Sequence, residues 1–264
     1  MDLDTGEHMR INNLKICGVT SPDTARFCAE TGVGALGAVF YPKSPRYVSP
    51  ERARALFNEL PPHVARVGVF VDMPVGEMLR IARAAALDTL QLHGSEPLDT
   101  LLAALAAGYR VIKVLKAAGE PLLAAARELP PSIGILVECG RGVLPGGNGA
   151  AWDWAGAAPL AALRPYALAG GLTPDNLAEA ARLSRASAWD LSSGVETAPG
   201  IKDHAAVARA VAALQVEAAA GDMGLGRPAR QLQGIAEGGD GFIAAAVVDE
   251  GAAVALLDAQ FGGQ

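Results

Sequence analysis

The feature that most restricts the fold of this 264-residue chain is a strict alternation of two kinds of segment. Short runs rich in Val, Ile, Leu and Phe are each followed by a longer stretch whose apolar residues recur at helical spacing. The segments expected to be strands are 14–18, 35–40, 66–72, 89–93, 110–115, 133–138, 166–170 and 188–193. The segments expected to be helices are 22–31, 50–60, 75–86, 97–107, 120–129, 152–163, 174–183 and 203–219.

Alternating strand–helix units imply a parallel sheet with right-handed crossovers. Eight such units in one run predict an α/β fold, a (β/α)8 TIM barrel formed by a single domain. We expect the barrel over residues 12–217, after an N-terminal tail at 1–11 in which Met9 is an alternative start. Residues 218–264 are expected to form a non-barrel C-terminal extension, either partly disordered or docked on the barrel or a second subunit. A homodimer is left open.

Composition excludes several other classes of protein. With 51% hydrophobic residues the chain has enough apolar material for a core, and three cysteines do not make a disulfide scaffold. No apolar run approaches the roughly 20 residues that cross a bilayer. The net charge of −6 argues against a nucleic-acid binder. The odd cysteine count and the lack of a signal-peptide pattern at 1–10 favour a cytoplasmic location.

Three expected helices begin with a hydroxyl residue followed by Pro and an acid. A hydroxyl side chain caps free backbone N–H groups, and Pro fits the first helical position because that N–H has no partner within the helix. The acid suits the positive end of the helix dipole. The pattern predicts N-caps at Ser21, Ser49 and Thr173.

Five of the expected strands have one apolar face and one face that becomes polar, mostly toward the C-terminal end. We expect the apolar face to pack under the helices and the polar face to point to the barrel axis, near the mouth where barrel active sites lie. The alternative is a buried polar layer without chemistry, which burial costs disfavour. The polar-face residues expected to point inward are Lys15, Cys17, Gln91, His93, Lys113, Glu138, Asp190 and Ser192.

Glycine-rich segments follow the seventh and eighth expected strands, at 168–174 and 190–196. Glycines let the backbone approach a phosphate, and loops at these two places are the usual phosphate site of a barrel. Ordinary turns and helix caps are the alternative. The expected phosphate-binding residues are Gly170, Gly171, Ser192, Ser193 and Gly194.

A thiol and a carboxylate end two of the strands. Cys17 can act as a general base if its pKa is lowered, and Lys15 shares its face; the alternative is a small buried hydrophobe, the role expected for Cys28. Glu138 supplies an acid. His93 is either catalytic or, as we favour, structural. No cluster has metal-ligand spacing and no dinucleotide or P-loop motif occurs, so no metal and no cofactor are expected.

Several short strings, in this order and at these spacings, together resemble the phosphoribosylanthranilate isomerase family over about residues 14–216. They are KICGVT at 15–20, FYPKSPRYVSP at 40–50, VGVFVD at 67–72, QLHG at 91–94, LAGGLTP at 168–174, DLSSGVE at 190–196 and PGIKD at 199–203. The family is a (β/α)8 barrel of tryptophan biosynthesis. It converts N-(5-phosphoribosyl)anthranilate to 1-(o-carboxyphenylamino)-1-deoxyribulose 5-phosphate by a cofactor-free Amadori rearrangement.

The resemblance implies a role for particular residues. It makes Cys17 the general base and places the general acid at Glu138, where the family has Asp. Glu reaches one methylene further, so the backbone must compensate. Arg46 matches the family's substrate-binding Arg and suits the anthranilate carboxylate by charge and planar shape. The other residues expected to bind substrate are Gln91, His93 and Asp190.

The loop after the sixth strand also departs from the family, because only its end at 146–149 is similar. Two alternatives to this isomerase stay open at the level of sequence. One is a catalytically weak barrel that binds a phosphorylated ligand and acts as a regulatory or assembly partner, which only Glu138 and the C-terminal tail support. The other is a different phosphosugar isomerase of the same fold.

Overall fold

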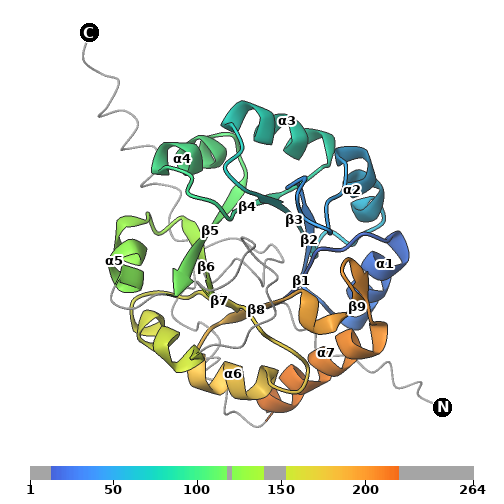
Figure 1. Ribbon diagram of the computed structural model, residues 1–264, viewed down its shortest axis with the longest axis vertical. Helices are drawn as coiled ribbons and strands as arrows, with labels where there is room; N and C mark the ends of the chain where they lie inside the picture. The colour runs from blue at the N-terminus through green and yellow to red at the C-terminus, as the bar shows by residue number, and fades with distance from the viewer. Residues whose placement is uncertain (1–12, 118–120, 140–152, 220–264) are drawn as a thin grey trace, which may run out of the picture.

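Eight parallel strands close into one barrel surrounded by helices, which confirms the predicted fold (Figure 1). The computed structural model describes residues 13–117, 121–139 and 153–219. The barrel strands are β1 (Leu14–Cys17), β2 (Ala35–Val39), β3 (Ala65–Phe70), β4 (Thr89–Leu92), β5 (Arg110–Ala117), β6 (Ile133–Cys139), β7 (Ala167–Ala169) and β8 (Ala188–Leu191).

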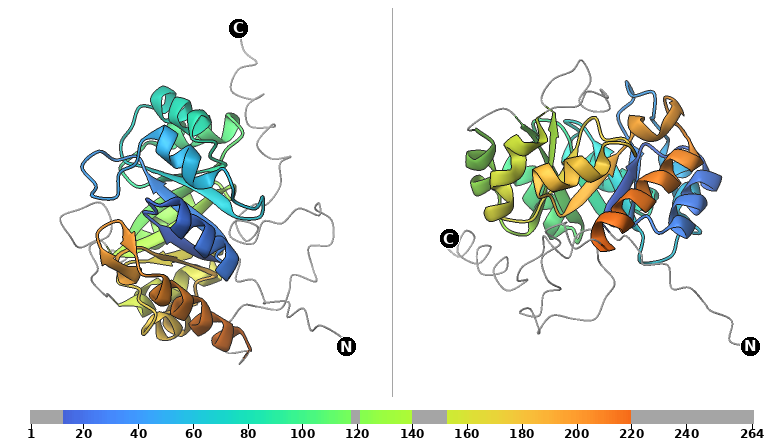
Figure 2. Two further views of the ribbon diagram at one scale, coloured as in Figure 1. Left: turned by 90° about the vertical axis from the view of Figure 1, so that its right-hand side faces the viewer. Right: turned by 90° about the horizontal axis from the view of Figure 1, so that it is seen from below.

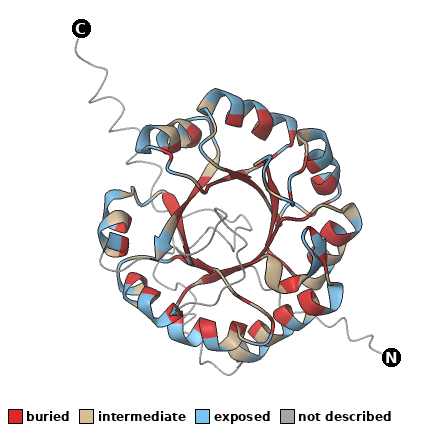
Figure 3. Cartoon of the chain, viewed as in Figure 1, coloured by how far each residue is buried: buried red, intermediate tan, exposed pale blue. Residues whose placement is uncertain are grey.

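The helices that follow the strands cover the outside of the barrel, and their inner faces are buried (Figure 3). They are α1 (Pro22–Thr31), α2 (Pro50–Phe57), α3 (Val75–Ala84), α4 (Leu98–Ala106), α5 (Pro121–Glu128), the 3-10 helix η1 (Trp154–Ala162), α6 (Leu177–Ser184) and α7 (His204–Ala219). Between β8 and α7 lie the short 3-10 helix η2 (Ser193–Val195) and a hairpin of β9 (Glu196–Ala198) and β10 (Ile201–Lys202). In both views of Figure 2 this hairpin and the segment between β2 and α2 project from the same end of the barrel.

The parallel register decides which side chains face the axis. Lys15 pairs with Ala35 on one side and with Asp190 on the other, so all three lie on the inner face. Alanine is the most frequent residue in the inner core. That inner core consists of Ala35, Ala65, Val67, Ile112, Val114, Leu136, Ala167, Ala169 and Ala188.

The expectation that Lys113 points inward is wrong. Val114 pairs with Leu136, which belongs to the inner core, so Lys113 faces outward. There its ammonium donates to the Gly94 carbonyl at 2.6 Å and forms an ion pair with Glu96 at 2.7 Å. Both faces of β5 contain apolar residues, and this buried ion pair explains how a charged residue occupies the face toward the helices.

The predicted helix starts have mixed outcomes. Ser49 caps α2 by accepting from the Arg52 backbone N–H at 3.2 Å, whereas Ser21 occupies the N-cap of α1 without a side-chain hydrogen bond. The cap predicted at Thr173 is wrong, since α6 begins only at Leu177 with Asn176 as its N-cap.

The helix predicted at 152–163 is a 3-10 helix, η1, and Pro159 lies inside it. Proline has no N–H to donate and its ring clashes with the preceding turn, so Pro159 disfavours a regular α-helix here. Helix α7 continues to Ala219, two residues past the predicted end of the barrel at 217. The predicted tail at 1–11, and the predicted extension apart from 218 and 219, lie outside the described residues. No helix in the described part of the chain is long and apolar enough to span a membrane.

Candidate active site

A buried ion pair between β1 and β8 lies at the C-terminal end of the barrel. The Lys15 ammonium, fully buried, donates to both carboxylate oxygens of Asp190 at 2.9 Å. Burial by itself lowers the pKa of Lys15, but attraction to Asp190 and to Cys17, with hydrogen bonds to both, raises it above the ordinary value. Lys15 is therefore a fixed positive charge beside the thiol.

Cys17 ends β1 on the same inward face, as predicted from the strand pattern. Its partner on β2 is Gly37, where a Cβ would approach the Cys17 sulfur to 3.0 Å, so the absent side chain leaves space for the thiol. Burial raises the pKa of Cys17 and outweighs the lowering by Lys15 and Lys202. The pKa of Cys17 is therefore raised, whereas a general base needs a lowered one.

Glu138, the last residue but one of β6, lies on the inner face of the barrel. Strand β6 itself lies across the barrel from β1 (Figure 1). Oε2 of Glu138 is 2.6 Å from Nε2 of His93, although the two groups are not aligned for a hydrogen bond. Nδ1 of His93 in turn lies 3.5 Å from the amide nitrogen of Gln91. The structure thus brings together three predicted site residues, Gln91 on β4, His93 just after it and Glu138 on β6, all of them buried.

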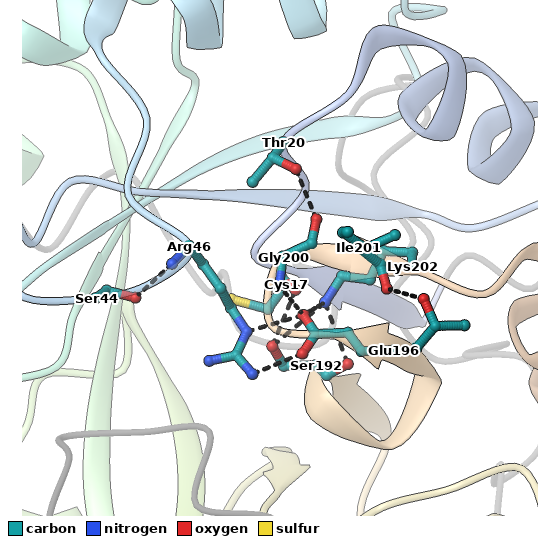
Figure 4. Close-up of polar contacts among 10 residues, drawn as sticks. Cys17, Thr20, Ser44, Arg46, Ser192, Glu196, Gly200, Ile201 and Lys202 are labelled. Carbon is teal, nitrogen blue, oxygen red and sulfur yellow. Dashed lines mark hydrogen bonds and ion pairs between the residues drawn. The ribbon is translucent and has the colours of Figure 1, made fainter.

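Arg46, between β2 and α2, lies beside Cys17 in a second cluster of charges (Figure 4). Its guanidinium forms a two-point ion pair with Glu196, with Nε to Oε1 at 2.8 Å and Nη2 to Oε2 at 2.6 Å. Lys202 adds a further contact to Oε1 of Glu196 at 2.7 Å. Hydrogen bonding to Glu196 is the main cause that raises the pKa of Arg46, so the guanidinium stays charged.

The loops after β7 and β8 are in contact with each other. A Cβ at Gly194 would overlap the backbone carbonyl of Leu172, so glycine is required where the two loops meet. Gly170 and Gly171 both have positive φ, at +89° and +69°. The Ser192 hydroxyl donates to the Cys17 carbonyl at 3.1 Å, which ties the second loop to β1.

Two charged residues of the site were not assigned a role from the sequence. Glu196 and Lys202 lie in the hairpin and pair with each other, while Arg46, the other partner of Glu196, is far away along the chain, so no local pattern reveals that contact. The signal that was available is their position within the strings DLSSGVE and PGIKD. In the described segments no group of three or more His, Cys, Asp or Glu residues is arranged to hold a metal ion.

A closed (β/α)8 barrel with a buried thiol and a buried carboxylate on opposite sides of its mouth defines a class of barrel enzymes that work by acid–base catalysis. The family model of N-(5′-phosphoribosyl)anthranilate isomerase matches residues 14–213, and the chain belongs to this family. The activity of the protein is the isomerisation of N-(5′-phosphoribosyl)anthranilate in tryptophan biosynthesis.

Known proteins agree with this assignment. The isomerase of Pseudomonas fluorescens is 42% identical over 196 residues, covering 73% of this chain and 93% of that protein. A crystal structure of a phosphoribosylanthranilate isomerase with reduced 1-(o-carboxyphenylamino)-1-deoxyribulose 5-phosphate is 37% identical, with a TM-score of 0.69, covering 77% of this chain and 98% of that one. A structure of monomers of the dimeric Thermotoga maritima isomerase is 36% identical, with a TM-score of 0.68 and coverages of 77% and 98%.

Proposed function

We propose that the isomerisation proceeds as an Amadori rearrangement in which Cys17 is the general base and Glu138 the general acid. The observation that carries the proposal is their placement on opposite sides of one barrel mouth. Each is buried and faces the axis; Cys17 is the last residue of β1 and Glu138 the last but one of β6. A substrate held between them would meet the carboxyl on one side and the thiol on the other.

The reaction needs one proton donated to the substrate and one proton removed from it. Glu138 protonates the ribose ring oxygen, the bond from that oxygen to C1′ breaks, and the anilinic nitrogen supplies the electron pair that forms an iminium ion. The Cys17 thiolate then removes the proton from C2′, giving an enol-amine that tautomerises to the ketone. The longer Glu side chain in place of the family's Asp is held at the strand end by its contact with His93.

Charge around Cys17 supports its role as a base. The thiolate is the reactive form, and burial disfavours it. Lys15 and Lys202 oppose that effect, since each lowers the pKa of Cys17. We expect Lys15 to be the group that holds the thiolate during the reaction.

Several side chains are available to hold the substrate. Arg46 suits the anthranilate carboxylate because it is charged and planar. Gln91 presents a buried amide oxygen that has no partner among the described residues, and it suits a ribose hydroxyl together with His93 and Asp190. We assign the phosphate to the loops after β7 and β8, with Gly170, Gly171, Ser192, Ser193 and Gly194, because the backbone there can come close to an anion.

The assembly and location of the protein are also proposals. One solved relative is a dimer, so a homodimer is the assembly to look for by analytical ultracentrifugation. The cytoplasmic location predicted from the cysteine content stays a prediction.

Complementation tests the activity in a cell. The gene should restore growth without tryptophan to an auxotroph that lacks this isomerase, and the Cys17→Ala gene should not. Failure of the unmodified gene despite soluble protein would count against the proposal. Growth supported equally by both genes would show that Cys17 is not the base.

A further inference from the structure

Glu196, on strand β9 of the hairpin, fixes the orientation of Arg46. Its two carboxylate oxygens accept from two different nitrogens of the guanidinium, at 2.8 and 2.6 Å (Figure 4). Both side chains are buried, with 4% of Glu196 and 9% of Arg46 exposed. A two-point contact of this kind fixes the plane and the direction of the guanidinium, which a single contact does not.

Gly18 confines the same arginine at its aliphatic part. A Cβ at Gly18 would overlap Cδ of Arg46, so the arginine side chain lies directly against the backbone that follows Cys17. Gly18 also has a φ of +73°, in the region that favours glycine. Arg46 is therefore held both along its stem and at its charged end.

The hairpin in turn holds Glu196. Its Oε1 accepts from Lys202 Nζ at 2.7 Å and from the Gly200 backbone N–H at 3.2 Å. Lys202 also donates to the Ser192 carbonyl at 3.1 Å, and the Thr20 hydroxyl donates to the Gly200 carbonyl at 2.6 Å. These contacts join the hairpin to the loops that follow β1 and β8, next to Cys17.

The pair with Glu196 leaves one edge of the arginine free. A guanidinium has a side edge, formed by Nε and Nη2, and an end edge, formed by Nη1 and Nη2. Glu196 occupies the side edge, and Nη1 of Arg46 points away from it without a hydrogen-bond partner in the described part of the chain (Figure 4). A second carboxylate can therefore bind the end edge while the first contact persists.

We propose that Glu196 is a positioning residue that makes Arg46 selective for the carboxylate of the anthranilate ring. Glu196 acts through Arg46, because it holds the end edge of the guanidinium at a fixed angle beside Cys17. The inference rests on the proposed role of Arg46 as the group that binds this carboxylate. A hairpin that serves only to stabilise the fold is the competing explanation.

The test compares two substrates, N-(5′-phosphoribosyl)anthranilate and N-(5′-phosphoribosyl)aniline, which lacks the carboxylate. Glu196→Gln should raise KM for the first roughly tenfold or more and change KM for the second by less than about threefold. In an Arg46→Met background the same substitution should cause no further change, because the two residues act as a unit.

Controls separate the possible outcomes. Thr197→Val alters a neighbouring exposed residue of the hairpin and should leave both KM values unchanged. Equal losses on both substrates, or losses that add to those of Arg46→Met, would overturn the positioning role. If Arg46→Met itself leaves the preference for the carboxylated substrate intact, the proposed function of Arg46 is wrong and the inference fails with it.

A second variant tests the proposal if Glu196→Gln does not fold. Glu196→Asp keeps the charge but shortens the side chain, and the ratio of its KM for the anthranilate substrate to its KM for the aniline analogue is compared with that of the wild type. A ratio that stays at the wild-type value in that variant overturns the inference. A ratio that shifts toward the analogue without the carboxylate supports it.

Discussion

Around Cys17, on one side of the barrel mouth, three cations and two carboxylates are buried together; around Glu138, on the other side, the ion-pair partner in the described structure is His93 alone. The first group, Lys15, Arg46 and Lys202 with Asp190 and Glu196, carries an excess of one positive charge that a thiolate would neutralise. In the described segments, the second group shows no ion pair with a lysine or arginine. The two groups proposed to transfer protons therefore lie in surroundings of very different charge.

The largest effect on activity is expected from a change on the Glu138 side of the mouth. Glu138→Gln removes the proton donor and keeps the shape, so kcat should fall about 10²- to 10⁴-fold while KM changes little. Steady-state kinetics on purified protein measures both constants. Near-full kcat in this variant would show that another group is the acid, with Asp190 the next candidate.

Lys15→Met should have the largest effect on stability on the Cys17 side. It leaves Asp190 buried without its partner, which costs about 3–5 kcal/mol in the free energy of unfolding, measured with urea. Arg26→Met is the matched control, because its pair with Glu59 is exposed and should change stability by less than about 1 kcal/mol. Similar losses in the two variants would contradict the account of a buried charge cluster.

A comparison of Gly18→Ala with Gly108→Ala distinguishes the effect of backbone strain from the effect of displacing Arg46. Both Gly18 and Gly108 have positive φ, at +73° and +86°, so alanine at either should destabilise the fold by about 1–2 kcal/mol. A Cβ at Gly108 meets nothing within 4 Å, whereas one at Gly18 overlaps Arg46. Only Gly18→Ala should therefore raise KM, and an equal rise in Gly108→Ala would contradict the explanation.

Acid should weaken the fold through two glutamates, Glu196 at the mouth of the barrel and Glu96 on its outer side. Hydrogen bonds and charges from Arg46 and Lys202 lower the pKa of Glu196, and Lys113 does the same for Glu96, in each case against the opposing effect of burial. A pKa lowered in the folded state adds stability above the ordinary value of 4.5, and this is lost as pH falls through the folded-state pKa. Urea unfolding below pH 4.5 should depend less steeply on pH in Glu196→Gln and in Glu96→Gln. An unchanged slope in both variants would contradict the assignment.

The smallest effect is expected from single hydroxyl groups. Ser192→Ala and Ser187→Ala each remove a hydrogen bond at 3.1 Å to a backbone carbonyl and should cost about 1 kcal/mol. Ser192 lies in the loop proposed to bind phosphate, so its variant should also weaken the affinity for inorganic phosphate, measured by calorimetry. An equal change of affinity in the Ser187 variant would remove the support for this loop.

The sequence predicts those features of the two sides that depend on local strand pattern, and not those that depend on contacts between distant residues. Alternation along β1, β4, β6 and β8 places Cys17, Gln91, His93, Glu138 and Asp190 on the inner face, because period two and a closed parallel register leave them no other side. Strand β5 has apolar residues on both faces, so its orientation follows only from its neighbours, and its own pattern predicts the wrong face for Lys113.

Long-range charge contacts are the part that sequence does not reveal. Arg46 and Glu196 are separated by 150 positions, and nothing near either residue indicates the other. The state of Cys17 is also beyond sequence, since Lys15 nearby suggests a lowered pKa while the extent of burial, known only from the fold, raises it. Predicted phosphate residues stay predictions, because their positions in the loops do not by themselves decide what they bind.

The most direct test of whether Cys17 is the general base is the kcat of Cys17→Ala. It is measured beside the kcat of the wild type on N-(5′-phosphoribosyl)anthranilate. The variant should remain folded, bind substrate with a similar affinity and lose about 10²- to 10⁴-fold in kcat, because only the proton acceptor is removed. A kcat within a few-fold of the wild type would contradict the assignment of Cys17 and, with it, the role given to the cations that surround it.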